Sequence, residues 1–194
     1  MDIKDIITYG LSIWGLIIAT KGLVTWRKQI KGTKEFETAY NLHYAVLKLR
    51  DAIKHVRNPA IWPSESYKAI QYSKAKYPDK SKEEIEKSSH PYVYEMRWEE
   101  IKNADTEMES HLLAAEVLWG PEILELLKPL NKKIVELNIA LQQNFQPELR
   151  TKNVMDLHDV IYDKGDGSTG EDAFSKEVSK AIGGITGYIK AKIS

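Results

Sequence analysis

Cysteine is absent from this chain of 194 residues. Its absence excludes a disulfide framework, a thiolate nucleophile and a zinc site with cysteine ligands. Net charge is absent as well, because 28 Lys and Arg residues balance 28 Asp and Glu residues. A neutral chain lacks the usual electrostatic reason to bind nucleic acid over its whole surface. From these residues we expect neither a metal ion nor a cofactor.

The short motifs of several enzyme classes are also missing. The sequence has no G-x-S-x-G and no H-E-x-x-H, and no G-x-G-x-x-G follows a strand. The run from Gly165 to Gly170 has the glycine spacing of a phosphate-binding loop, but Glu171 and Asp172 stand where Lys and Ser or Thr are required. Two carboxylates would repel a phosphate. We therefore interpret this loop as an acidic turn.

An apolar segment near the amino terminus is the most distinctive feature that the sequence does contain. Residues 6–26 are apolar apart from Lys21 and a few hydroxyl residues. Roughly 20 helical residues, at about 1.5 Å each, span the hydrocarbon layer of a bilayer. The segment therefore predicts one transmembrane helix, with Lys21 reaching toward the interface. The alternatives are a signal peptide, a buried core helix and a helix lying in the membrane plane.

Basic residues on one side of this segment predict its orientation. Only Lys4 precedes it, whereas four basic residues follow it: Arg27, Lys28, Lys31 and Lys34. The positive-inside rule then places the carboxyl-terminal part in the cytoplasm and the amino terminus on the other side of the membrane. The predicted division is an anchor with its basic flank over residues 1–31 and a cytoplasmic helical domain over residues 32–194.

One face of the predicted span consists of small or weakly polar residues. They recur at spacings of four and three: Thr8, Ser12, Gly15, Ala19 and Gly22. Small residues let helices approach closely in lipid, and hydroxyl groups can form hydrogen bonds between helices. Because no second span is predicted for this face to pack against, we predict that copies of the chain associate through it. In one form of this hypothesis the hydroxyl groups of the face line a pore. The alternative is that the small residues coincide by chance.

Hydrophobic periodicity predicts that the rest of the chain is helical. Over residues 33–58 apolar residues recur at every third or fourth position, and Asn58-Pro59 ends the pattern. Residues 92–119 are predicted to form one long helix or a broken pair. Further helices are predicted over residues 122–144 with a kink or break at Pro129, after Pro147, and from Phe174 onward with close packing or a hinge at Gly183-Gly184. Residues 64–90 are either a mobile excursion or a helical hairpin. The predicted fold class is all-α, with one transmembrane helix and a bundle of about five helices.

Two histidines could carry chemistry. His55 follows Arg50 with four residues between them, and such a pair can cut RNA without a metal when His transfers the proton and Arg stabilises the phosphate charge. Five positions along a straight helix, however, turn the two side chains about 140° apart. The second candidate set is Arg150, Asn153 and His158. His158 shares the apolar period of Val154 and Ile161, so we expect it to face inward, where a core histidine is the alternative to a catalytic one.

The span over residues 6–26 and these two motifs together resemble the small membrane-anchored accessory protein encoded beside the RNA-guided, RNA-cutting effector of type VI-B CRISPR loci. The resemblance implies a helical body related to HEPN ribonuclease domains. It also implies a ring-like homo-oligomeric pore, such as an octamer, that enhances antiphage defence after the effector has recognised phage RNA. HEPN domains place their motif at the start of a late helix, which favours Arg150, Asn153 and His158. Seven residues separate Arg150 from His158, more than the family spacing.

Three functions follow from these observations. The first is an inner-membrane pore that depolarises or permeabilises the membrane, with the lipid bilayer and further copies of the chain as partners and a functional link to the CRISPR effector. The second is a membrane-tethered, metal-independent ribonuclease of HEPN type; direct RNA binding stays open, and the neutral charge counts against it. The third is an anchored helical module that binds a cytoplasmic protein.

Overall fold

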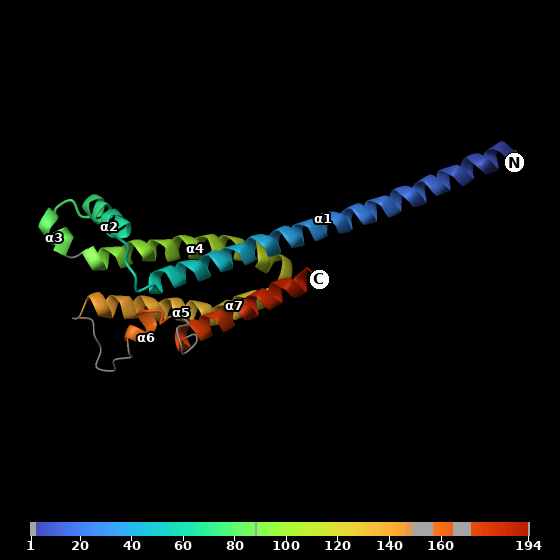
Figure 1. Cartoon of the computed structure of the whole chain (residues 1–194). Coiled ribbons are helices and arrows are strands. Elements are labelled where there is room, and N and C mark those ends of the chain that lie inside the picture. Colours follow the sequence, from blue (N-terminus) through green and yellow to red (C-terminus); the bar gives the residue numbers. More distant parts are fainter. Residues whose placement is uncertain (1–2, 88, 147, 149–156, 165–171, 194) are drawn as a thin grey trace.

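The computed structural model describes the chain apart from residues 1–2, 88, 147, 149–156, 165–171 and 194, and apart from the side chains of residues 4–13, 82, 86–87 and 89. The described residues form helices and no strand, which confirms the all-α prediction (Figure 1). The helices are α1 (Ile3–Arg57), α2 (Pro63–Lys76), α3 (Lys82–Lys87), α4 (Ser89–Trp119), α5 (Glu122–Phe145), α6 (Leu157–Ile161) and α7 (Ala173–Lys192).

Helix α1 is a single helix of 55 residues. It continues through Gly32 and Thr33, so the predicted division between residues 31 and 32 falls within a continuous helix. The helix ends at Arg57, as the sequence predicts, because Pro59 lacks an amide hydrogen and disfavours helical geometry at Asn58. Only the carboxyl-terminal half of α1 lies in the bundle, and its amino-terminal half protrudes beyond the other helices (Figure 1).

The bundle is built by helices that run alongside one another. Helix α1 packs against α4 and α7, and α5 packs against α4, α6 and α7. The apolar period of α1 forms one wall of the core, where Leu42, Val46 and Leu49 are completely buried. On α5 and α7 the corresponding residues include Leu130, Leu137 and Ile185. Burial of these apolar side chains is the main stabilising contribution to such a bundle.

The segment over residues 64–90 is a helical hairpin rather than an excursion without structure. Helices α2 and α3 fold back on the start of α4. A small second core holds them there, formed by Ala69 of α2, Ile85 of α3, and Tyr92 and Val93 of α4. The sequence left both alternatives open, because these apolar residues are few and scattered among Lys, Ser and Glu.

Two predicted irregularities differ in the structure. Helix α5 continues through Pro129, which lies within its first turns, so the helix is not divided there. In α7, Gly183 and Gly184 are exposed, and a Cβ atom at either would meet open space. Close packing therefore does not explain this pair. Gly120, by contrast, has a φ of 91°, a left-handed conformation that favours glycine and ends α4.

In the part of the chain that the structure describes, no helix is long and apolar enough to cross a membrane. The side chains of residues 6–13, the first part of the predicted span, lie outside the described residues. Two residues of the small-residue face, Thr8 and Ser12, belong to that part. The described portion of the predicted span begins at Trp14.

Candidate functional site

The bundle covers one side of α1 and leaves the opposite side open. Leu42, Leu49 and Ile53 face the core and are buried. At 100° per residue, three aromatic residues spaced by four positions lie on the other side: Phe36, Tyr40 and Tyr44. Their exposed fractions are 60%, 62% and 56%, and the Tyr40 and Tyr44 rings stack with centroids 6.4 Å apart. We call the side of α1 that carries these three residues its outer face.

The outer face continues into the protruding half of α1. Gly22 precedes Tyr40 by 18 residues, which is five turns of about 3.6 residues, so both lie on the same side. Gly15 and Ala19 lie within about 60° of that direction. A Cβ atom added at Gly15 or Gly22 would meet nothing. The three described small residues and the exposed aromatic residues therefore lie on one side of α1.

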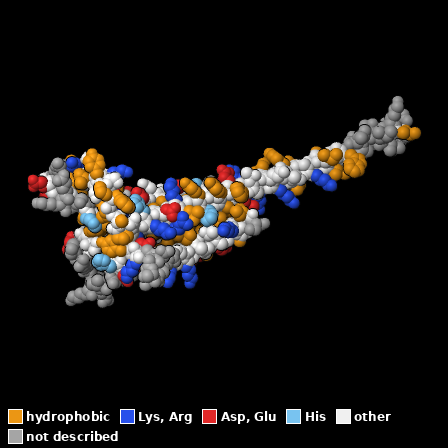
Figure 2. Space-filling view, in the orientation of Figure 1, with side chains coloured by type: hydrophobic (Ala, Val, Ile, Leu, Met, Phe, Trp, Pro, Cys, Tyr) orange, Lys and Arg blue, Asp and Glu red, His pale blue; other side chains and the backbone are white. Residues whose placement is uncertain are grey.

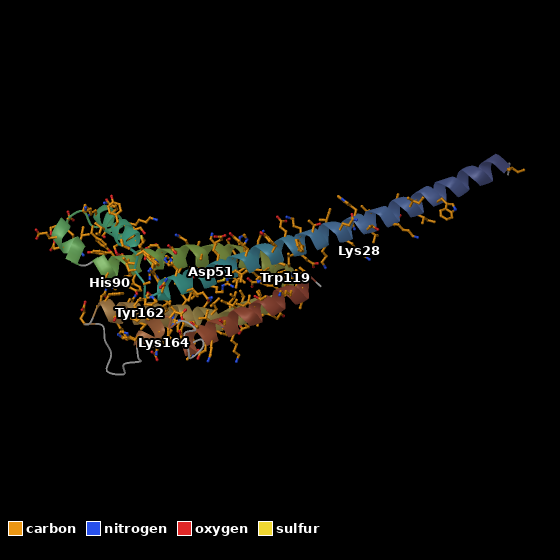
Figure 3. The ribbon with its side chains drawn as sticks, viewed as in Figure 1. Lys28, Asp51, His90, Trp119, Tyr162 and Lys164 are labelled. Atoms are coloured by element: carbon orange, nitrogen blue, oxygen red, sulfur yellow. The ribbon has the colours of Figure 1, made fainter. Side chains whose placement is uncertain are left out.

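The protruding part of α1 also exposes large apolar side chains. Trp14, Leu16 and Ile18 are 67%, 70% and 65% exposed. Figure 2 shows hydrophobic side chains along this part, with Lys and Arg side chains along the helix toward the bundle. Lys28 is one of these basic residues and lies on the protruding helix (Figure 3). A contiguous apolar surface of this kind is uncommon on a monomer that is surrounded by water, and it marks a site of interaction.

Arg50 and His55 do not share a site, as their angular separation predicted. Arg50 pairs with its neighbour Asp51 at 2.7 Å and lies near Val178 and Ser179 of α7. His55 faces α2 and α4 instead, with Nδ1 2.7 Å from a Glu100 oxygen and Nε2 3.4 Å from Glu65. The imidazole thus lies between two carboxylates, and no arginine from α1 joins it.

His158 lies on α6, but it does not face inward. Its side chain is exposed, whereas Leu157, Val160 and Ile161 of the same helix are buried. The prediction that His158 faces the core is therefore wrong. The short helix turns its three apolar residues to the core and leaves His158 on the outside. The His158 ring lies 5.2 Å from that of Tyr162. Arg150 and Asn153, its proposed partners, lie outside the described residues.

Two buried arginines are the polar residues that the sequence reasoning missed. Arg97 is fully buried, and its guanidinium donates hydrogen bonds to both carboxylate oxygens of Glu65, at 2.8 Å for Nη2, and to the carbonyl oxygens of Asn58 and Ala60 at 2.6 and 2.7 Å. The turn after α1 is thereby fixed to α4 and α2. A signal was present in the sequence, because Arg97 falls four residues from both Val93 and Ile101, in the apolar period.

Arg57, the last residue of α1, forms a second buried ion pair next to the turn that follows this helix. It is 2% exposed, and its guanidinium lies 4.4 Å from the centre of the Phe174 ring. Its hydrogen-bond acceptors come from α6, from the residues after it and from the start of α7: the carbonyl oxygens of Val160, Asp159 and Tyr162, the Ser175 hydroxyl and the Asp172 carboxylate. The backbone oxygen of Arg57 also accepts a hydrogen bond from Asp163.

The carboxylates beside these arginines have lowered pKa values. Hydrogen bonding by Arg97 is the largest effect on Glu65 and lowers its pKa, although burial acts in the opposite direction. For Asp172 burial is the largest effect and would raise the pKa, but the Ser175 backbone amide and the Arg57 guanidinium together hold it below 3.8. Both carboxyl groups are therefore ionised at neutral pH, and the two centres are structural ion pairs.

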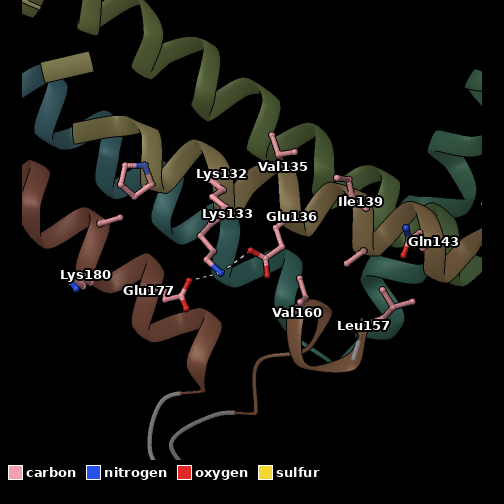
Figure 4. Close-up of a pocket in the computed structure, with 13 residues that line it drawn as sticks. Lys132, Lys133, Val135, Glu136, Ile139, Gln143, Leu157, Val160, Glu177 and Lys180 are labelled. Carbon is pink, nitrogen blue, oxygen red and sulfur yellow. Dashed lines mark hydrogen bonds and ion pairs between the residues drawn. The ribbon is translucent and has the colours of Figure 1, made fainter. Parts of the chain in front are cut away.

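A cavity of about 900 Å³ lies between α5, α6 and α7 (Figure 4). Its walls include Val135, Ile139 and Val160. The ammonium group of Lys133 lies between two carboxylates, at 2.7 Å from Glu136 and 2.6 Å from Glu177. This central charge is already neutralised, so it connects α5 to α7 and does not form a reactive centre. Among the described residues, no group of three or more His, Asp or Glu side chains could hold a metal ion.

Comparison with known proteins finds no relative of this chain. No known family, curated protein or solved structure matches the chain. The class that the fold and the exposed surface define is an all-α bundle whose first helix protrudes and carries a free outer face.

Proposed function

We propose that this protein is anchored in the bacterial inner membrane by the protruding half of α1 and assembles there into a homo-oligomer, with the bundle in the cytoplasm. One observation carries the proposal: a single continuous helix joins an exposed apolar segment to an outer face that the chain's own bundle leaves uncovered. The apolar side chains would contact lipid, and the outer face would contact a second α1.

The charge distribution supports this arrangement. Arg27 and Lys28 follow the apolar segment, and no described carboxylate pairs with either. Basic residues in this position attract the anionic cytoplasmic surface of a bilayer. Trp26 is exposed on the same turn, where an aromatic ring suits the interface between lipid and water.

The finer proposal concerns what the oligomer does. The resemblance to the accessory protein of type VI-B CRISPR loci supports a pore that depolarises the membrane during defence against phage. A ring of parallel α1 helices would turn the weakly polar face of each helix toward its neighbours or toward the pore, because small residues permit close approach.

Membrane association is tested by replacing exposed apolar residues of the protruding helix. We expect the full chain to stay with membranes after carbonate extraction and the double variant Leu16→Asp/Ile18→Asp to move largely to the soluble fraction, since each carboxylate costs about 2.5–3.5 kcal/mol in the centre of a membrane helix. Val117→Asp is the control, because Val117 is also highly exposed, at 85%, but lies on α4. If the unchanged chain moved to the soluble fraction to the same extent as the double variant, the membrane anchor would be refuted.

Self-association through the outer face is tested by light scattering in detergent, with the detergent contribution subtracted. We expect the full chain to have the mass of a ring, roughly six subunits or more, since a pair of helices cannot enclose water. Tyr40→Arg places like charges on facing copies and should reduce the mass to that of smaller species, as should Gly15→Leu or Ala19→Leu. Tyr67→Arg is the control, because Tyr67 is 64% exposed on α2. An unchanged mass in all three variants would exclude the outer face as the interface.

A further inference from the structure

A second cavity, of about 420 Å³, lies between the start of α4 and the end of α5. Its lining residues do not belong to the outer face of α1 or to either arginine ion pair, although the Arg97 guanidinium lies 5.4 Å from the centre of the Tyr94 ring in its wall. Five aromatic rings form much of its wall: Tyr77, Tyr92, Tyr94, Trp98 and Phe145. The Tyr77, Trp98 and Phe145 rings are half-buried, so part of each is accessible from the cavity. A wall of this composition suits a flat ring, which can stack on aromatic side chains.

Carboxamide groups form the α5 side of the cavity. Asn138 and Gln142 are one helical turn apart, with the Gln142 nitrogen 3.4 Å from the Asn138 oxygen, and Gln146 follows one turn later. A carboxamide presents a donor and an acceptor side by side. That pairing matches the edge of a nucleobase, and adenine in particular, whose amino group and ring nitrogen pair with Asn or Gln.

One cation lies at the rim of the cavity. The Lys80 ammonium donates a hydrogen bond to the Tyr92 hydroxyl at 3.0 Å and lies 4.8 Å from the centre of the Tyr77 ring. No described carboxylate forms an ion pair with it, whereas the other charged group of the wall, Glu95, is already bound by Lys76 and by the Tyr77 hydroxyl at 2.7 and 2.8 Å. The free charge of the cavity is therefore positive, which disfavours a cationic ligand and favours an anionic one.

A buried tyrosine also lines the cavity. Tyr94 is 2% exposed. Tyr162 acts on its hydroxyl through its charge and through a side-chain hydrogen bond. Burial, with a smaller effect of Tyr162, raises the pKa of Tyr94 to about 12, so the hydroxyl remains a donor at neutral pH.

We propose that this cavity binds an adenine nucleotide. The base lies against the Trp98 and Phe145 rings, the carboxamides of Asn138 and Gln142 bind its edge, and the Lys80 ammonium binds its phosphate. This site does not depend on the membrane anchor or on self-association, so it can fail or hold independently of the function proposed above.

The test is isothermal titration of the full chain in detergent with adenosine monophosphate, with adenosine and inorganic phosphate as parallel probes. We expect saturable binding of the monophosphate, binding of adenosine that is about tenfold weaker because Lys80 loses its partner, and no saturable binding of phosphate alone. A tetraadenylate with a 5′-phosphate distinguishes the two sources of this chemistry: it binds more weakly than the monophosphate if the ligand is a free nucleotide, and more tightly if it is the end of a strand.

Two variants locate the site. Lys80→Met should weaken the monophosphate about tenfold and leave adenosine unchanged, whereas Gln142→Ala should weaken both. Both side chains are exposed, so the fold should survive, which circular dichroism checks. Lys68→Met and Gln71→Ala on α2 are the matched exposed controls. Absence of saturable monophosphate binding, binding of phosphate alone with equal affinity, or equal affinity in Lys80→Met and Lys68→Met would overturn the proposal.

Discussion

Replacing Arg57 by Met is expected to lower the free energy of unfolding by about 3–5 kcal/mol, the usual cost of removing one partner of a buried ion pair. The substitution keeps the apolar stem but removes the guanidinium, which is 2% exposed. The Asp172 carboxylate, 3.1 Å away, would then be buried without its cation. Three carbonyl oxygens would lose a donor at the same time. For a chain of this size the unfolding midpoint should fall by roughly 10 °C, measured by circular dichroism.

Arg50→Met provides the control for this prediction. Arg50 lies two turns earlier on α1 and pairs with the exposed carboxylate of Asp51, so its loss should cost less than about 1 kcal/mol.

The pH dependence of stability gives a second check on the Arg57 prediction. Because the pKa of Asp172 is held below 3.8, its contribution to stability is complete above that pH and is lost as the pH falls through the lowered value. The difference between Arg57→Met and the unchanged chain should therefore shrink below about pH 4, and a difference that grew would contradict the assignment.

Arg97→Met should have an effect of similar size, again about 3–5 kcal/mol. Arg97 is completely buried and bonds both oxygens of Glu65 and two carbonyl oxygens of the turn that follows α1. Without it, the turn loses its attachment to α4, and the helical hairpin of α2 and α3 should open before the bundle unfolds. Hydrogen exchange would detect this as faster exchange in α2 than in α5.

The double variant Glu65→Met/Arg97→Met distinguishes the cost of an unpaired buried charge from the cost of lost packing. Replacing both partners removes the uncompensated buried charge, so the double variant should be more stable than Arg97→Met alone. Lys102→Met on the same helix is the control, because Lys102 is exposed and pairs one turn away with Glu99. If the double variant were less stable than either single variant, burial of an unpaired charge would not be the cause of the loss.

Both arginines illustrate what periodicity can and cannot reveal. Each lies four residues after a buried apolar residue of its own helix, Ile53 for Arg57 and Val93 for Arg97, so the pattern places both side chains in the core. Which groups satisfy them is not a local property. The acceptors of Arg57 lie more than 100 residues later in the chain, and only the packing of α6 and α7 against α1 brings them together.

His158 shows that periodicity can also place a side chain in the core when the folded chain leaves it exposed. Its spacing from Val154 and Ile161 suggested the core, but α6 has only five residues. In so short a helix the surrounding contacts, and not a repeated period, decide which side faces inward. The helical hairpin over α2 and α3 was likewise ambiguous, since its stability depends on Tyr92 and Val93 of α4.

The sequence by itself determined the helical class, the end of α1 at Arg57 and the apolar character of the amino-terminal segment, because the period of apolar residues and the geometry of proline act locally. The tertiary structure decided which side of α1 stays uncovered, and which helices Arg50 and His55 contact. These features depend on contacts between segments far apart in the chain, and such contacts form only when the bundle closes around one side of α1.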